Sequence, residues 1–160
     1  MDLFPKYYTL ALRYLTRRPR SKKEIYDYLI KKNATEEVIQ QVVKKLHEQK
    51  FQDDREFAKW WVEQRSKNRV KSDLIIGIEL RQKGIAPEII TSLLQGDRNE
   101  RVSDLDKARL IAEKKIKLLS RLPRNEQYQK LGAFLSRRGY SFEISKQVID
   151  DILERGYNRD

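Results

Sequence analysis

The sequence predicts an all-α fold made of three tandem three-helix repeats. Apolar residues recur at helical spacing along the chain, and no strand-length stretch alternates between apolar and polar residues. In addition, one motif occurs three times: an amphipathic helix ending in Leu, a basic stretch, a helix-stopping residue and another amphipathic helix. Leu29, Leu80 and Leu135 mark the copies, which lie 51 and 55 residues apart. Such self-similarity indicates stacked helical units, so we expect about nine helices in an elongated, curved array.

The first repeat is expected to cover residues 1–51. Pro19 should end its first helix, because the proline ring fixes φ and proline has no amide proton. Ser21, with Glu24 three residues later, is a capping-box pattern that predicts the start of a second helix. That helix should stop at Asn33, a residue type that tolerates the left-handed conformation of a helix end. A third helix should follow, capped by the next hydroxyl residue, Thr35.

The second repeat is expected to cover residues 52–96. Its first helix should begin at the paired acids Asp53 and Asp54, because Asp is a good cap and carboxylates complement the positive N-terminal end of a helix. A second helix should carry an apolar stripe and stop at a glycine. The stripe is predicted as Leu74, Ile75, Ile78 and Leu80. The residues predicted to build this repeat are Asp53, Asp54, Phe57, Ala58 and Gly84.

The third repeat is expected over residues 97–160, after a polar linker at residues 95–101 that contains one glycine and no periodic apolar residue. Pro123 should break the chain between its first and second helices. Gly139 should end the second helix, and Ser141 should cap the last one.

The composition favours a polyanionic partner and argues against several classes of protein. Lys and Arg number 35 against 24 Asp and Glu, so the net charge is +11. The chain has no Cys, which excludes disulfides, a cysteine nucleophile and thiolate zinc sites. No apolar run approaches the ~20 residues that span a bilayer, and the N-terminus lacks an apolar signal segment. We therefore expect a cytoplasmic, soluble monomer.

Nothing in the sequence predicts an enzyme. His47 is the only histidine and lies close to the end of a predicted helix, where a lone histidine is far more often a solvated residue than a catalytic base. Asp53 and Asp54 could suggest acid–base or Mg²⁺ chemistry, but their place directly before an apolar helix favours capping. The six glycines are scattered singly, so no phosphate-binding loop is present. We predict no catalytic residue, no metal and no cofactor.

Basic residues gather at the turn between the first and second helices of the repeats. Stacked repeats would align these turns into a stripe that contacts phosphates, although charges in loops can also serve only solvation. Trp60 and Trp61 are neighbours and cannot share a helix face, so we expect Trp61 in the core. Trp60 is then an interface anchor or packs against the adjoining repeat. The candidate contacts are Arg17, Arg18, Arg20, Lys22, Trp60, Arg65, Lys67, Arg69 and Lys71.

Two stretches resemble the RecX regulatory proteins. Asp53-Asp54-Arg55-Glu56-Phe57-Ala58, then Arg65, then Glu79-Leu80-Arg81-Gln82-Lys83-Gly84-Ile85 is similar to the signature core of that family. The stretches 11–15 and 18–25 are similar to its opening. The resemblance is strong over residues 7–94 and rests on the repeat pattern alone from residue 95. One departure is Val70-Lys71-Ser72, where the family pattern has a glycine.

The resemblance implies a protein of tandem three-helix repeats that regulates the RecA recombinase. Members bind the RecA filament on single-stranded DNA, usually inhibit it, and need neither catalytic residues nor a cofactor. The hypothesis is therefore a regulator that limits the recombinase, ATPase and coprotease activities of RecA. Two alternatives remain: a direct nucleic-acid-binding module with no RecA partner, and a structural adaptor whose charge only keeps it soluble.

Overall fold

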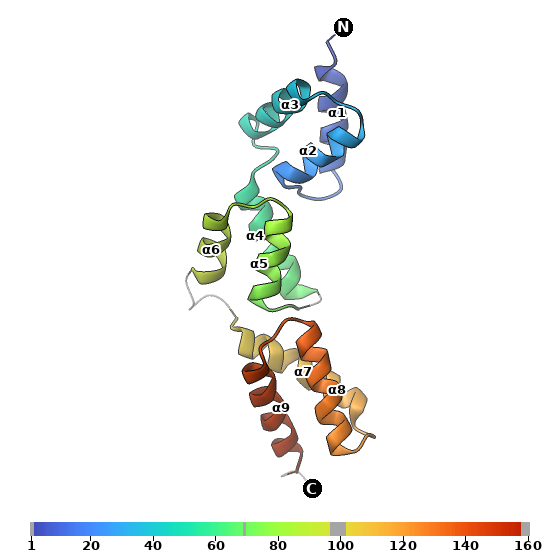
Figure 1. Ribbon diagram of the computed structural model, residues 1–160, viewed down its shortest axis with the longest axis vertical. Coiled ribbons are helices and arrows are strands. Elements are labelled where there is room, and N and C mark those ends of the chain that lie inside the picture. Colours follow the sequence, from blue (N-terminus) through green and yellow to red (C-terminus); the bar gives the residue numbers. More distant parts are fainter. Residues whose placement is uncertain (1, 69, 97–101, 158–160) are drawn as a thin grey trace. The chain divides into compact units, whose positions relative to one another are not determined.

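The computed structural model describes residues 2–68, 70–96 and 102–157 (Figure 1). Over these ranges the chain forms nine α-helices and no strand, which confirms the all-α prediction. None of the helices in this described part is long and apolar enough to cross a membrane. The helices are α1 (Phe4–Leu15), α2 (Lys22–Lys31), α3 (Glu36–Glu48), α4 (Asp54–Lys67), α5 (Asp73–Gln82), α6 (Pro87–Gln95), α7 (Asp104–Leu119), α8 (Arg124–Arg137) and α9 (Phe142–Tyr157).

The chain divides into two compact units. The first unit comprises Met1–Gln64 and Glu79–Leu94, and the second comprises Arg65–Ile78 and Gln95–Asp160. The division passes through α4 and α5, so the middle three helices contribute residues to both units. The predicted linker at residues 95–101 lies mostly outside the described residues, because positions 97–101 are not described.

The core of the first unit lies between α1, α2 and α3, which pack against one another. Each helix presents one apolar face to this core, as the helical spacing of its apolar residues predicts. Half-buried residues such as Val38 pack around the edge of the cluster. The buried members are Tyr7, Ala11, Ile25, Leu29, Ala34, Ile39, Val42, Val43 and Leu46.

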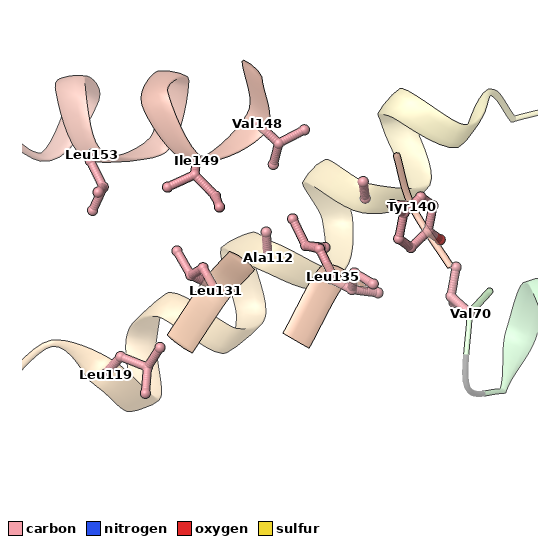
Figure 2. Packing of buried hydrophobic residues seen from close by; sticks show 11 residues of the cluster. Val70, Ala112, Leu119, Leu131, Leu135, Tyr140, Val148, Ile149 and Leu153 are labelled. Carbon is pink, nitrogen blue, oxygen red and sulfur yellow. The ribbon is translucent and has the colours of Figure 1, made fainter. Parts of the chain in front are cut away.

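The core of the second unit lies between α7, α8 and α9 (Figure 2). Leu131 and Leu135 of α8 point toward Val148 and Ile149 of α9, with Ala112 of α7 beside them. The stretch between α4 and α5 also contributes a residue, because Val70 belongs to this cluster next to Tyr140. The remaining buried members are Ala108, Ile111, Leu119 and Leu153.

The predicted apolar stripe of α5 is partly wrong. Leu74 and Ile78 are 65% and 38% exposed, whereas Ile76 and Leu80 are fully buried. The helix reads Leu-Ile-Ile-Gly-Ile-Glu-Leu over residues 74–80, so apolar side chains lie nearly all round it. Periodicity cannot select a buried face on such a helix, and packing against neighbouring helices decides which side is covered.

Two of the three predicted hydroxyl caps are confirmed. Ser21 and Glu24 form the reciprocal capping box, and Ser141 Oγ accepts the N–H of Ile144 at 3.3 Å. Thr35 occupies the predicted cap position of α3, but its side chain makes no capping hydrogen bond, so only the position is confirmed. The acids in the first turn of α3 still complement the positive end of the helix.

Among the described residues, four helices end in the same left-handed turn, at Asn33, Lys50, Gly84 and Gly139. In each case the next residue donates its N–H to the carbonyl five positions back, as Ile85 does to Leu80 at 3.0 Å. Glycine and Asn are the usual residues here. Lys50, at φ 60°, is the exception, and a bulky residue in this conformation costs about 1–2 kcal/mol.

Candidate functional site

The start of α2 is held by the first residue of α4, in an arrangement that we call the first joint. Asp54 Oδ1 accepts the backbone N–H of Lys22 at 2.8 Å. Asp53 instead caps its own helix, because its Oδ1 accepts two N–H groups of the first turn of α4, at 2.8 and 3.0 Å. Two adjacent acids therefore cap two different helices. The sequence suggests only the local cap, and Asp54 serves the helix of the preceding repeat.

Glu24 is the buried charge of the first joint. Its carboxylate accepts hydrogen bonds from Arg18 Nη2 at 2.6 Å, from Lys83 Nζ at 2.8 Å and from the Ser21 N–H at 3.2 Å. Burial by itself raises the pKa of Glu24, but these bonds and the positive charge of Arg18 outweigh burial and hold that pKa below its ordinary value. Arg18, a predicted partner contact, thus has its guanidinium engaged inside the molecule.

Both tryptophans are half-buried, which corrects the prediction of one core and one surface residue. Trp61 Nε1 donates to Glu79 Oε2 at 2.9 Å, so its indole has a polar partner as well as an apolar contact. The guanidinium carbon of Arg18 lies 5.7 Å from the Trp60 ring centroid and 5.9 Å from that of Trp61. Phe57 packs against both rings. The pair therefore belongs to the first joint, and the anchor role of Trp60 stays a prediction.

The predicted contacts of the first unit surround the turn between α1 and α2. Arg17 and Lys22 are exposed there. Arg20 lies flat on Tyr14, with its guanidinium carbon 3.8 Å from the ring centroid. Tyr14 in turn stacks on Tyr28 at 4.2 Å and an interplanar angle of 9°. This stack fixes the position of the Arg20 charge at the surface of the first unit.

The predicted contacts of the second unit lie around the turn between α4 and α5. Lys67 is exposed at the end of α4, and Arg65 and Lys71 are half-buried. Arg69 lies outside the described residues. This group belongs to the second unit, whereas the basic group around the α1–α2 turn belongs to the first.

A concave surface of about 510 Å³ lies in the first unit between the α1–α2 turn, the α3–α4 turn and α4. We call it the Trp60 groove. Sequence analysis missed two of its residues, Lys50 and Phe51; the side chain of Phe51 is 56% exposed. A bulky residue in a left-handed helix end, such as Lys50, could have pointed to this groove. Its φ angle, however, is visible only in the structure. The lining residues are Leu15, Thr16, Arg18, Pro19, Arg20, Lys50, Phe51, Gln52, Asp53, Glu56, Phe57 and Trp60.

The start of α5 is held by the first residue of α7, in an arrangement that we call the second joint. The N–H of Asp73 donates to the two carboxylate oxygens of Asp104 at 3.1 and 3.2 Å. Lys107 is the buried charge here, 4% exposed, and its ammonium donates to Asp73 at 2.7 Å and to Asp104 at 3.3 Å. Ser72 caps α5 through its Oγ and donates its own N–H to the carbonyl of Arg138 at 3.1 Å. All of these residues lie in the second unit.

His47 and Tyr140 are two further polar residues whose neighbours the structure describes. His47 Nδ1 lies 3.3 Å from the carbonyl oxygen of Gln52 at the end of α3. Burial and the nearby charges of Asp104 and Asp73 raise the pKa of Tyr140 despite the opposing effect of Arg138, so this phenol stays protonated. No group of three or more His, Cys, Asp or Glu that could hold a metal ion is found in the described part of the chain.

Comparison with known protein families accounts for all three groups of helices. Residues 8–46 match the model of the RecX first three-helix domain, residues 53–94 match that of the second, and residues 103–149 match that of the third. The chain belongs to the RecX family. The three matched segments correspond to α1–α3, α4–α6 and α7–α9, so the tandem arrangement of three-helix RecX domains is confirmed.

Individual RecX proteins are similar over nearly the whole chain. Regulatory protein RecX of Geobacillus sp. (strain WCH70) is 35% identical over 149 residues, 92% of this chain and 54% of the relative. That of Bacillus subtilis (strain 168) is 32% identical over 151 residues, 94% of this chain and 56% of the relative. The chain thus spans about half the length of these curated relatives.

Solved RecX structures share the fold. The crystal structure of RecX from Lactobacillus salivarius superposes with a TM-score of 0.71 at 25% identity, covering 92% of this chain and 95% of that one. A second crystal structure, of a regulatory protein RecX, gives a TM-score of 0.76 at 28% identity, covering 93% of this chain and 74% of the other.

Proposed function

We propose that this chain regulates RecA by binding the RecA filament on single-stranded DNA, and that it inhibits the filament. The observation that carries the proposal is the match of three RecX domains in order along the chain. The net charge of +11 supports it, because a strongly basic protein is drawn to a filament that contains DNA. In this proposal the chain acts in the cytoplasm as a monomer without catalytic residues or a cofactor.

The contacts proposed in the first unit are Arg17, Arg20 and Lys22. Arg17 and Lys22 are exposed beside the α1–α2 turn, and Arg20 is held in place by Tyr14. Arg18 is a weaker candidate than the sequence suggests, because its charge is paired with Glu24. In the second unit the proposed contacts are Arg65, Lys67 and Lys71, together with Arg69 outside the described residues.

The test follows the single-stranded-DNA-dependent ATPase of RecA while the chain is added in substoichiometric amounts. The expected result is a lower ATPase rate and a shorter filament lifetime. A combined Arg17→Ala and Lys22→Ala variant should need more protein for the same effect, while Lys130→Ala, which removes an exposed lysine of α8, should behave like the wild type. Unchanged ATPase at all ratios would reject the proposal.

The alternative is a module that binds nucleic acid directly and has no RecA partner. The Trp60 groove favours it, because aromatic and basic side chains share one concave surface. The salt dependence of binding distinguishes the two functions. A phosphate binder should hold bare single strands with a steep salt dependence, whereas a filament regulator should prefer RecA-coated DNA at the same salt concentration.

A further inference from the structure

We propose that the Trp60 groove holds one nucleotide of a single-stranded nucleic acid. In this arrangement the base lies against the rings of Phe51 and Trp60, and the phosphate lies against Arg20 and Lys50. The inference rests on the proposed function for the origin of the strand, which would be the DNA of the filament. The groove itself can be tested with a bare strand.

The aromatic part of the groove consists of one exposed ring, Phe51, and one half-buried ring, Trp60. Phe51 is 56% exposed, whereas Phe57, six residues later, is 1% exposed in the core of the joint. Leaving a phenylalanine in water gives up the stabilisation that its burial would provide. Trp60 lines the same groove and packs against Phe57, with ring centroids 6.0 Å apart. A cavity of about 510 Å³ is within the usual size of small-ligand sites.

The two acids in the lining of the groove bond to groups other than Arg20 and Lys50. Asp53 accepts two N–H groups at the start of α4, and Glu56 pairs with Lys59 at 3.0 Å. Arg20 is oriented by its stacking on Tyr14, 3.8 Å from the ring centroid, before any ligand arrives. Lys50 is exposed at the edge of the groove. Two cations, Arg20 and Lys50, therefore line the groove in which an anionic group would bind.

The backbone of Lys50 supports a role for its side chain. Gly84 and Gly139 end their helices in this conformation without a side chain, and Asn33 is the residue type that tolerates it best after glycine. Lys50 adopts φ 60° although a glycine would fit with less strain. The left-handed turn places Lys50 and Phe51 side by side in the lining of the groove.

A nucleotide fits these features better than a peptide does. Each nucleotide carries a flat aromatic face and an anion in one unit, which are the two kinds of group that the groove recognises. Single-strand-binding proteins combine the same elements, namely rings on which bases stack and a basic track for the backbone. An acidic peptide would have to supply its carboxylate and its apolar group from different residues. Stacking is tolerant of sequence, so no base preference is expected.

Tryptophan fluorescence reports on this groove directly, because the chain has only two tryptophans, Trp60 and Trp61. The full chain is titrated with a thymidine oligonucleotide and, separately, with a peptide of Glu and Phe. We expect the oligonucleotide to quench the emission with a salt-dependent affinity. Phe51→Ala should weaken binding roughly 5- to 150-fold, the range expected for losing one stacked base. Phe142→Ala removes a phenylalanine that is 78% exposed in the second unit and should bind like the wild type.

Lys50→Gly gives a test in which stability and binding change in opposite directions. Removing the strained side chain should raise the melting temperature, while losing one phosphate contact should reduce the logarithmic salt slope by about 0.7. A raised melting temperature would then show that Lys50→Gly does not lose binding through unfolding. Asn33→Gly makes the matched backbone change at the end of α2 and should leave the salt slope unchanged.

The possible results separate the groove from the proposed function. Wild-type affinity in both Phe51→Ala and Lys50→Gly, or quenching by the peptide alone, overturns the nucleotide site. If Phe51→Ala loses the bare strand but still lowers the RecA ATPase, the site stands and the filament is contacted elsewhere. If the strand quenches the wild type and the RecA ATPase never changes, the site stands and the proposed function fails.

Discussion

The two joints make the same backbone contact but bury charges of opposite sign. In the first joint the N–H of Lys22, the first residue of α2, donates to Asp54 at 2.8 Å. In the second joint the N–H of Asp73, the first residue of α5, donates to Asp104 at 3.1 Å. Each acceptor is itself the first residue of the next helix bundle, α4 or α7. The amide-to-carboxylate contact is therefore independent of the side chain on the donor residue.

The buried charge differs between the joints. The first joint buries the acid Glu24 beside two bases, Arg18 and Lys83. The second joint buries the base Lys107 beside two acids, Asp73 and Asp104.

The two charges also come from opposite sides of the joints. Glu24 lies three residues after the capping Ser21, where the second joint has Ile75 after Ser72. Lys107 lies three residues after Asp104, where the first joint has Phe57 after Asp54. In the first joint the position three residues after the capping Ser is charged, and the position three residues after the acceptor Asp is apolar. In the second joint the first of these positions is apolar and the second is charged. The comparison shows that backbone geometry defines a joint and that the ionic group can come from either side.

The largest expected effect is that of adding a side chain at Gly84 or Gly139, which lie against the starts of α2 and α5 in the two joints. Gly139→Ala would place a Cβ 2.1 Å from Ile75 Cγ1 and 2.6 Å from Ser72 Oγ, at φ +86°. The unfolding free energy, measured with urea, should fall by about 2–5 kcal/mol from conformational strain and overpacking together. Gly84→Ala, whose Cβ would meet Lys23 Cβ at 2.8 Å, should cost less because Lys23 is exposed and can shift.

Gly132→Ala is the control for these two variants. It lies inside α8, where a new Cβ would meet only Ile149 Cδ1 at 3.9 Å, an ordinary contact. Alanine is the better helix former, so the variant should be more stable by about 0.5–1 kcal/mol. If Gly139→Ala behaved like Gly132→Ala, close packing at the second joint would be refuted.

The second expected effect tests the buried base. Lys107→Met keeps most of the aliphatic stem but removes the ammonium between Asp73 and Asp104. We expect a loss of about 2–3 kcal/mol in unfolding free energy, less than for a fully buried pair because these acids are 32% and 25% exposed. Lys130→Met at the exposed surface of α8 should change stability by less than about 0.5 kcal/mol. If Lys107→Met left the unfolding free energy unchanged, the second joint would need no buried charge.

The helices of both joints could be predicted from the sequence, but the contacts between them could not. Gly84 and Gly139 are recognisable as helix ends because the signal is local, and Asp53 is recognisable as the cap of the helix that follows it. Asp54 instead caps a residue 32 positions earlier, and Lys107 pairs with a residue 34 positions earlier. Neither pairing leaves a periodic or local trace. Both depend on how the repeats stack.

The tryptophan pair shows a second limit of sequence reasoning. The expectation of one core and one surface ring assumed that a helix has a single apolar side facing a single core. Trp60 and Trp61 instead lie beside Arg18, and Trp61 also has Lys83 near its ring and a hydrogen bond to Glu79. A mixed polar and aromatic surrounding lets two neighbouring rings be half-buried together.

The third expected effect uses pH to isolate the buried acid of the first joint. The folded pKa of Glu24 lies below the unfolded value of about 4.3, so its stabilisation is fully present above about pH 5 and is lost as the pH falls through the folded pKa. Glu24→Gln should therefore cost about 1–2 kcal/mol at pH 7, measured by urea unfolding, and the gap to the wild type should narrow as the pH falls through the folded pKa. Glu63→Gln, which removes an exposed carboxylate from the middle of α4, should change stability by less than about 0.5 kcal/mol at pH 7 and in acid. If the difference in unfolding free energy between the wild type and Glu24→Gln did not change with pH, the loss would come from the shape of the side chain and not from its charge.

The smallest expected effect separates the two acceptor carboxylates. Asp54 accepts hydrogen bonds from two neutral groups, the Lys22 N–H and the Gln52 side-chain amide, and an asparagine oxygen can accept the same bonds. Asp54→Asn should therefore cost only about 0.5 kcal/mol, the difference between a charged and a neutral acceptor. Asp104 also faces the buried ammonium of Lys107, so Asp104→Asn should cost about 1–2 kcal/mol in the same urea experiment. Equal losses for the two variants would mean that the joints differ in sequence but not in their electrostatics.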